Sequence, residues 1–248
     1  METLKNSIQF KVWGRYALFT DPLTKMGGER CTYHIPTYEA LKGIAKSIYW
    51  KPTLIWYIDK VRVMKPIRTQ TKSTKPLKMS GGNDLSIYTY LADVEYQVLA
   101  HFEWNYHREE LAGDRIDGKH FQIVRRMLER GGRQDIFLGT RDCQGYVEPC
   151  IFGEYKGHYD NVDEVSYGLM FHGFDYPDET GKDELVTRLW WPVMKHGVID
   201  FDRPEHCPVR KFIRPMRAKI FGEGKNLKIV EKEYGEILHR SGAEASEL

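Results

Sequence analysis

"PTYEALKGIAKSIYWKP", residues 36–52, decides the fold, because it predicts an amphipathic helix with a defined beginning and end. Thr37 is of a type that caps helix N-termini, and Pro52 prevents the helix from continuing past it. Between these limits, apolar residues recur every three or four positions and form one stripe: Leu41, Ile44, Ala45 and Ile48. We therefore expect this helix to pack its apolar face on a sheet.

Strand patterns flank this helix on both sides. Residues 7–14, SIQFKVWG, alternate apolar and polar side chains, and residues 53–70 are dense in β-branched and aromatic residues. A turn, SGGND, precedes another extended stretch at 85–105, which we expect to be interrupted near 91–93. The two long middle strands can extend past the sheet, so the sequence predicts a protruding β-hairpin over about 60–90.

A second helix is predicted within DRIDGKHFQIVRRMLERGG, residues 114–132, with Asp117 as its N-cap and Gly131–Gly132 as its stop. A short strand, QDIFLGT, follows. The order is then strand, helix, strand, strand, helix, strand, which is that of ferredoxin-like folds and of RRM-type RNA-binding folds. The sequence therefore predicts an α+β protein whose residues 1–142 form a ferredoxin-like (RRM-like) N-terminal domain.

Beyond this domain the pattern changes to short strands separated by turns. Three strands are expected, at 167–176, 184–193 and 196–201. Together they predict a small antiparallel β-sheet C-terminal domain over 143–205. The remainder, 206–248, is a basic to mixed-charge C-terminal tail in which periodicity predicts no element.

The totals limit the class of protein. The chain has 248 residues, of which 41% are hydrophobic and 29% charged, so wholesale disorder is excluded. A net charge of +2 gives no global indication of nucleic-acid binding, which must be argued from local clusters. No secretory signal or membrane span is visible. Four cysteines without CxxC spacing argue against a zinc site and favour reduced thiols in a cytoplasm.

Two clusters of cationic residues are candidates for RNA contacts. Members of the first would repel one another unless an anion neutralised them, and a phosphate backbone is the natural partner. The alternative is a solvated sheet edge that its lysines protect against aggregation. This first cluster runs along the predicted hairpin with no acidic residue between its members: Lys60, Arg62, Lys65, Arg68, Lys72, Lys75 and Lys78. The second cluster lies around the second helix: Arg125, Arg126, Arg133 and Arg141.

Lys119 and His120 lie at the start of the second helix, and neither has an obvious carboxylate or metal partner nearby in sequence. One interpretation is catalytic, because a neutral imidazole accepts a proton from a hydroxyl while an ammonium stabilises a pentacoordinate phosphorus. The other interpretation is that both are solvated residues of a first helical turn. Tyr49, at the edge of the apolar stripe, is by itself expected to be a half-buried aromatic with its hydroxyl in solvent.

Several blocks of the sequence resemble one known family. They occur in order and without large gaps between about residues 7 and 206. These blocks are ALFTDPLTKMGGE, PTYEALKGIAKSIYWKPT, GKH, GGRQDIFLGTRDCQGYV and HGFDYPDETG. Together they closely resemble the Cas-five protein of type I-C CRISPR systems. The tail after Pro208 carries no motif of this kind.

This resemblance implies a ferredoxin-like N-terminal domain, a small C-terminal β-sheet and an enzymatic function. The implied enzyme cuts CRISPR repeat RNA at the base of its hairpin by attack of a ribose 2′-hydroxyl, without a metal or other cofactor. It then stays on the 5′ handle of the mature crRNA within the interference complex. The implied partners are the repeat RNA, the crRNA, the Cas-seven backbone and the large Cas-eight subunit, in the cytoplasm. The family's proposed catalytic residues fall on Tyr49, Lys119 and His120.

Two rival functions stay open at this point. A ferredoxin-like RNA binder can serve as a purely structural subunit that caps the guide RNA, because the fold does not reveal catalysis. A basic hairpin also accepts the backbone of double-stranded DNA, so binding to duplex DNA is the second alternative.

Overall fold

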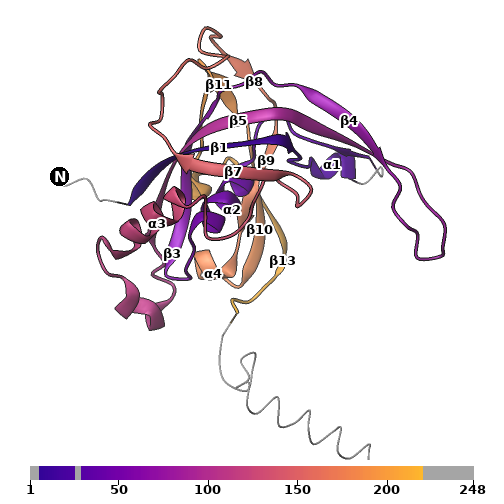
Figure 1. The fold of residues 1–248 in the computed structure, drawn as a ribbon. Helices are drawn as coiled ribbons and strands as arrows, with labels where there is room; N and C mark the ends of the chain where they lie inside the picture. Colours follow the sequence, from indigo (N-terminus) through magenta and orange to yellow (C-terminus); the bar gives the residue numbers. More distant parts are fainter. Residues whose placement is uncertain (1–5, 26–28, 220–248) are drawn as a thin grey trace, which may run out of the picture.

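The structure is a computed structural model, and it describes residues 6–25 and 29–219. Figure 1 shows the arrangement of its elements. In chain order they are β1 (Ser7–Ala17), α1 (Pro22–Lys25), β2 (Arg30–Cys31), α2 (Tyr38–Ile48), β3 (Leu54–Val63), β4 (Thr69–Thr74), β5 (Ser86–Trp104), the 3₁₀ helix η1 (Glu109–Asp114), α3 (Lys119–Glu129), β6 (Ile136–Phe137), β7 (Gln144–Pro149), β8 (Val165–Ser166), β9 (Met170–Asp175), α4 (Pro177–Thr180), β10 (Glu184–Trp190), β11 (Val193–Lys195), β12 (Val198–Asp200), the 3₁₀ helix η2 (Pro204–His206) and β13 (Val209–Pro215).

A ten-stranded, mostly antiparallel sheet forms the main layer. Its path runs β6-β7-β1-β5-β3-β12-β11-β8, with β2 and β4 paired to β5 beside it. The central strand β1 pairs antiparallel with β5 and β7, and β5 pairs antiparallel with β3. Helix α2 contacts β3, while α3 contacts β1 and β7. The prediction of a mixed protein with antiparallel sheets and few helices is confirmed.

Helix α2 forms as its sequence predicts. The Thr37 hydroxyl accepts a hydrogen bond from the Ala40 backbone N–H at 3.2 Å, so the expected N-cap is present. All four residues of the predicted apolar stripe are buried, and Leu41 is completely covered. Truncating such a buried leucine to alanine typically costs about 2–5 kcal/mol, so the stripe is a major part of the core.

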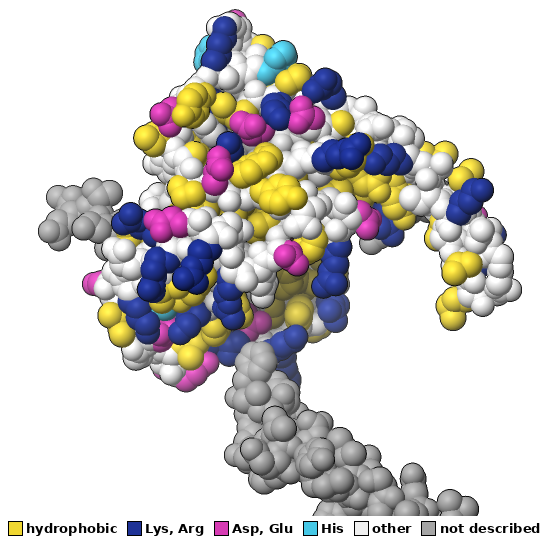
Figure 2. Space-filling model, viewed as in Figure 1, with side chains coloured by type: hydrophobic (Ala, Val, Ile, Leu, Met, Phe, Trp, Pro, Cys, Tyr) yellow, Lys and Arg dark blue, Asp and Glu magenta, His cyan; other side chains and the backbone are white. Residues whose placement is uncertain are grey.

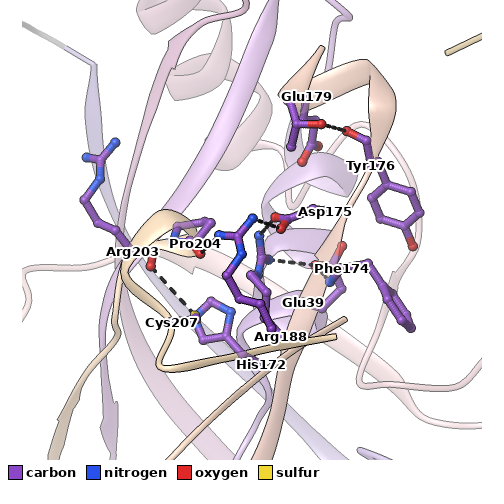
Figure 3. A network of polar contacts seen from close by, with 12 residues as sticks. Glu39, His172, Phe174, Asp175, Tyr176, Glu179, Arg188, Arg203, Pro204 and Cys207 are labelled. Carbon is purple, nitrogen blue, oxygen red and sulfur yellow. Dashed lines mark hydrogen bonds and ion pairs between the residues drawn. The ribbon is translucent and has the colours of Figure 1, made fainter. Parts of the chain in front are cut away.

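A three-stranded sheet, β13-β10-β9, lies against α2 through β9. Figure 3 shows the polar network at this junction. Arg188 of β10 is buried and donates to the Asp175 carboxylate of β9, to which Arg210 of β13 also donates. The same Arg188 guanidinium lies 3.8 Å from the Glu39 carboxylate of α2. The network thus joins the smaller sheet to the helix whose C-terminal end carries Tyr49.

An arm made of β4 and the first part of β5 extends away from the rest of the ribbon (Figure 1). Strand β5 pairs with β4 through its first residues and with β3 through its last ones. At Asp93, between these two pairings, the backbone has φ 54°, a left-handed conformation. The expected interruption near 91–93 is therefore a local change of backbone conformation within one continuous strand.

The strands after residue 142 are divided between the two sheets. Strands β7 and β12 pair with β1 and β3 of the larger sheet, whereas β9 and β10 belong to the smaller one. The expected grouping of three strands was therefore wrong for β12, and β13, within the predicted tail, takes its place. Nearly every residue of β13 is exposed, which removes the alternation that would have revealed it. The domain boundary at residue 142 stays a prediction.

Two further expectations concern the whole chain. No helix within the described ranges is long and apolar enough to cross a membrane. All four cysteines are free thiols. Residues 220–248 of the predicted tail lie outside the described residues.

Candidate functional site

Helix α3 begins at Lys119, so Lys119 and His120 occupy its first turn as expected. The predicted N-cap, Asp117, was wrong: the N-cap is Gly118, and no side chain caps the helix. The reason is the backbone turn at Gly118, whose φ of 74° lies in the left-handed region that glycine adopts without steric cost. This turn brings the start of α3 to the C-terminal end of α2.

Tyr49 forms the C-cap of α2 and meets His120 there. Its hydroxyl lies 2.9 Å from His120 Nδ1, and the Trp56 indole donates to its backbone carbonyl at 2.9 Å. The Tyr49 side chain is buried, so the expectation of a hydroxyl in solvent was wrong. This burial raises the pKa of Tyr49, which makes its hydroxyl a donor at neutral pH.

His120 is fully buried, with both ring nitrogens in hydrogen bonds. Its Nε2 lies 2.7 Å from the backbone carbonyl oxygen of Asp114. A carbonyl only accepts, so Nε2 carries a proton; in the neutral ring, Nδ1 then accepts from the Tyr49 hydroxyl. The Trp104 ring stands edge-on to the imidazole, with the centroids 5.4 Å apart. The packing thus fixes one tautomer and one orientation of His120.

Lys119 does have a carboxylate partner, which corrects the expectation from sequence. Its Nζ lies 2.5 Å from Asp114 Oδ1. Lys51 Nζ lies 3.1 Å from Asp114 Oδ2, and the Thr53 hydroxyl donates to the same oxygen at 2.9 Å. The bond from Lys119, with those from Thr53 and Lys51, holds the pKa of the Asp114 carboxyl well below its usual range. Asp114 is therefore an ionised acceptor between two ammonium groups.

Sequence reasoning missed Lys51, Thr53 and Asp114. Tyr49 is extended at the C-cap of α2, and a turn closed by the bond from the Leu54 N–H to the Lys51 carbonyl follows it. Tyr49, Lys51 and Thr53 all reach the same cluster. Lys51 and Thr53 belong to this turn, and no periodicity in the sequence pointed to them. Asp114 is brought in by a 3₁₀ helix that follows the sheet, and no local pattern pointed to it.

Most cations of the first predicted RNA cluster have acidic partners within the protein. The run itself contains no acid, but its neighbours on the adjoining strands and turns do. The pairs are Lys60 with Asp200 (2.5 Å), Arg62 with Asp160 (2.8 Å), Lys65 with Asp93 (2.7 Å), Arg68 with Asp93 (3.3 Å) and Lys78 with Asp84 (3.7 Å).

Arg62 is the clearest departure from the expected RNA contacts. It is buried, and its guanidinium also donates to Gln97 and to the backbone carbonyls of Glu154 and Tyr155. We therefore assign it a structural role. Lys72 is different, because its Nζ lies 3.4 Å from the centroid of the Tyr16 ring rather than against a carboxylate.

The second predicted cluster has two residues on α3, Arg125 and Arg126, and two in the segment that follows it, Arg133 and Arg141. Arg125, Arg126, Arg133 and Arg141 are exposed, and none of them forms an ion pair with another described residue. Lys and Arg side chains gather over α3 in Figure 2, on the same helix that carries Lys119. This face of α3 is thus cationic without internal neutralisation.

The geometry therefore brings together Tyr49, Lys119 and His120, as the resemblance implied, and adds Lys51, Thr53 and Asp114. A hydroxyl and an imidazole in contact can move a proton. Two ammonium groups beside them can stabilise negative charge.

Comparison with known families gives one match over most of the chain. A family model described as CRISPR-associated protein (Cas_Cas5) matches residues 7–202. Two relatives are each named CRISPR pre-crRNA endoribonuclease Cas5d. That of Mannheimia succiniciproducens is 28% identical, over 79% of this chain and 95% of its own. That of Thermus thermophilus is 27% identical, over 73% of this chain and 79% of its own.

Solved structures give a consistent result. A structure described as a CRISPR-associated protein is 35% identical, with a TM-score of 0.69 over 83% of this chain and 96% of that one. A protein of Streptococcus mutans, described as functionally uncharacterized, is 36% identical, with a TM-score of 0.65 over the same shares.

Proposed function

The chain belongs to the Cas5d family of CRISPR-associated proteins, and from this premise we propose that it is an endoribonuclease that cuts CRISPR repeat RNA. It would cut the repeat hairpin and stay on the 5′ handle of the crRNA, beside Cas-seven and Cas-eight subunits in the cytoplasm. The two relatives named as pre-crRNA endoribonucleases support this activity. The observation that carries it is the contact between Tyr49 and His120, two residues 71 positions apart, beside Lys119.

The sheet order supports an RNA-binding fold. Strands β7, β1, β5 and β3 follow one another in an antiparallel sheet, and α2 and α3 connect them in the chain order β-α-β-β-α-β. This is the arrangement expected for a ferredoxin-like domain. The β4–β5 arm supports the protruding hairpin of the same hypothesis (Figure 1).

The proposed reaction needs a base for the 2′-hydroxyl of the nucleotide before the cut. As that oxygen bonds to phosphorus and the bond to the 5′ oxygen breaks, its proton passes to the Tyr49 oxygen, and the Tyr49 proton passes to His120 Nδ1. His120 then holds this proton as an imidazolium until the products leave. Water protonates the leaving 5′ oxygen, so the products are a cyclic phosphate and a 5′-hydroxyl.

Lys119 would stabilise the negative charge of the pentacoordinate phosphorus. Its side chain is partly exposed, whereas His120 is closed off. Access to Tyr49 and His120 therefore requires the covering segment to move. That segment includes η1, none of whose residues is buried, so its displacement sacrifices little packing.

The RNA backbone would follow the cationic face of α3 to this site. The exposed Arg125, Arg126, Arg133 and Arg141 supply charges that no described acid neutralises. Of the arm, Lys72 and Lys75 are the residues best placed to contribute, since neither forms an ion pair with a described residue. The paired cations of the arm contribute less, because RNA must first compete with their carboxylates.

Product analysis tests the proposed function. We expect purified protein to cut repeat RNA in excess EDTA and to leave a 5′-hydroxyl and a cyclic phosphate. A 2′-deoxy substitution at the nucleotide before the cut should block cleavage and preserve binding. Loss of activity in EDTA with rescue by magnesium would refute the metal-free mechanism. Cleavage of the deoxy substrate would show that water is the nucleophile.

The closed state of His120 favours one rival, a crRNA-binding subunit without nuclease activity. That function predicts tight binding of repeat RNA with no products under any of these conditions. Equal affinity for repeat RNA and for a DNA duplex of the same length would instead indicate the duplex-binding alternative.

A further inference from the structure

The Asp114 carboxylate is held by the kind of donor set that binds a phosphate. Two ammonium groups and one hydroxyl, from Lys51, Lys119 and Thr53, point at its two oxygens. Each ammonium carries three donors, and both lysine side chains are more than one third exposed. Such a set of donors can hold an anion, and in the free protein that anion comes from the chain itself.

The residue that supplies this anion is on a segment that can leave. Asp114 is the last residue of η1, which has no buried residue and no side-chain cap at its beginning. The donors, by contrast, are on firm elements. Thr53 is buried directly before β3, Lys51 lies in the short connection between α2 and β3, and Lys119 begins α3. Displacement would therefore move Asp114 and leave the three donors in place.

We propose that the Asp114 carboxylate occupies the position that the scissile phosphodiester takes in the RNA complex, which we call the phosphate seat. Lys51, Thr53 and Lys119 bind this phosphate once RNA has displaced the carboxylate. The proposal rests on the proposed function. It adds Lys51 and Thr53 to the residues that bind the phosphate, and it makes the Asp114 carboxylate a competitor of the RNA phosphate. The contacts of this segment support it, because Tyr49, Lys51 and Thr53 all reach the same cluster.

Displacement of Asp114 has a second effect on the site. The backbone carbonyl of the same residue holds His120 Nε2 at 2.7 Å. When the carboxylate leaves its seat, this carbonyl moves with it and His120 loses the bond that closes it off. Binding of the phosphate and opening of the catalytic pair thus become one event, and the free protein stays closed.

Binding measurements test the competitor. The ligand is repeat RNA made uncleavable by a 2′-deoxy substitution, at one fixed salt concentration. We expect Asp114→Asn to tighten binding about three- to tenfold, because the competing charge is gone while the side-chain shape is kept. Glu110→Gln removes the same charge from the same helix without touching the lysines, so it should change affinity by less than about twofold. Equal effects of the two variants, or weaker binding by Asp114→Asn, would overturn the proposal.

Chemical modification of lysines gives a second measurement that needs no variant. Acetylation of the free protein and of its complex with the same RNA is compared by mass spectrometry. We expect Lys51 and Lys119 to be protected in the complex. Lys195 of β11, which pairs with Glu164, is the control and should be modified equally in the free protein and in the complex. An unprotected Lys51 beside a protected Lys119 would overturn the assignment of Lys51.

The two proposals fail in different ways. If the wild-type protein binds repeat RNA but never cuts it, the proposed nuclease function fails. Tighter binding by Asp114→Asn and protection of Lys51 would still establish the phosphate seat. If the protein cuts RNA but Asp114→Asn does not bind RNA more tightly and Lys51 is not protected, the proposed phosphate seat is wrong while the proposed nuclease function is supported.

Discussion

Two clusters in this protein have the same composition and different surroundings. In each, two lysines share one carboxylate: Lys42 and Lys46 with Glu179, and Lys51 and Lys119 with Asp114. The two carboxylates are similarly covered, with Glu179 16% and Asp114 21% exposed. The lysines differ: Lys42 is 2% and Lys46 30% exposed in the first cluster, whereas Lys51 is 42% and Lys119 37% exposed in the second.

The difference shows that burial decides what such a cluster can do. Glu179 is on α4, whose Pro177 is buried, and it joins that helix to α2. A buried ammonium cannot lose its carboxylate without a large desolvation cost, so the first cluster is structural. In our proposal the second exchanges its carboxylate for a phosphate, and the solvent exposure of both its lysines supports this. The following predictions test this contrast, from the largest expected effect to the smallest.

The largest effect is expected at the histidine beside the exposed cluster. His120→Ala should lower the single-turnover cleavage rate by about 10²–10⁴-fold and change RNA affinity little, since proton transfer is needed only in the transition state. His172 is an equally buried histidine on β9, near Lys42. His172→Ala is therefore the control: it should lower stability and leave the rate per folded protein unchanged. Equal losses of rate in both variants would mean that His120 is only a core residue.

The next effect is the pH dependence of stability at the buried cluster. Burial by itself would raise the pKa of Glu179, but Lys42 and Lys46 outweigh it and lower the pKa to about 2. A lowered pKa stabilises the folded state above the unfolded value of about 4.3, and this contribution is lost as the pH falls towards 2. Glu179→Gln should thus cost roughly 2–3 kcal/mol at pH 7 by urea unfolding.

At pH 2–3 the wild type and this variant should approach each other in stability. Glu164→Gln, at an exposed ion pair with Lys195, serves as the control and should differ little from the wild type at either pH. A Glu179→Gln deficit that stayed constant from pH 7 to pH 3 would show that the loss does not come from ionised Glu179.

A smaller effect separates unpaired from paired cations. Replacing Arg125, Arg126 and Arg133 together by alanine should weaken RNA binding and lower the log–log salt slope by about 0.7–0.9 per lost phosphate contact. Replacing Lys60, Lys65 and Arg68, which have carboxylate partners, removes the same formal charge and should lower the slope less. A larger decrease in slope for the Lys60, Lys65 and Arg68 variant would instead indicate that the cations from Lys60 to Lys78 are the main RNA contact.

The smallest effect compares one lysine of each cluster, Lys51 and Lys46. Lys51→Ala should lower the salt slope of RNA binding by at most one contact, about 0.7–0.9. Lys46→Ala removes an equal charge, 2.8 Å from the Glu179 carboxylate, and should leave the slope unchanged. Identical slopes for the two variants would contradict the contrast drawn between the clusters.

Local sequence determined the elements that depend on near neighbours. The cap at Thr37 and the buried stripe from Leu41 to Ile48 follow from spacing within one helix, and both were predictable. The family resemblance also located Tyr49, Lys119 and His120 before any geometry was known. In contrast, β13 was missed because an exposed edge strand shows no alternation.

Only the tertiary structure decided which charges are free. The sequence between Lys60 and Lys78 contains no acid, yet Asp93 and Asp200 reach it from other strands and Asp160 from a turn, and Arg62 is buried. Asp114 is likewise delivered to Lys51, 63 residues away in the chain. The physical reason is that helix propensity and periodicity act over a few residues, whereas burial and ion pairing depend on where the sheet places distant segments. The sequence alone thus determined the two longer helices and, through the resemblance, the candidate catalytic residues, and the fold determined which cations remain available to an anion.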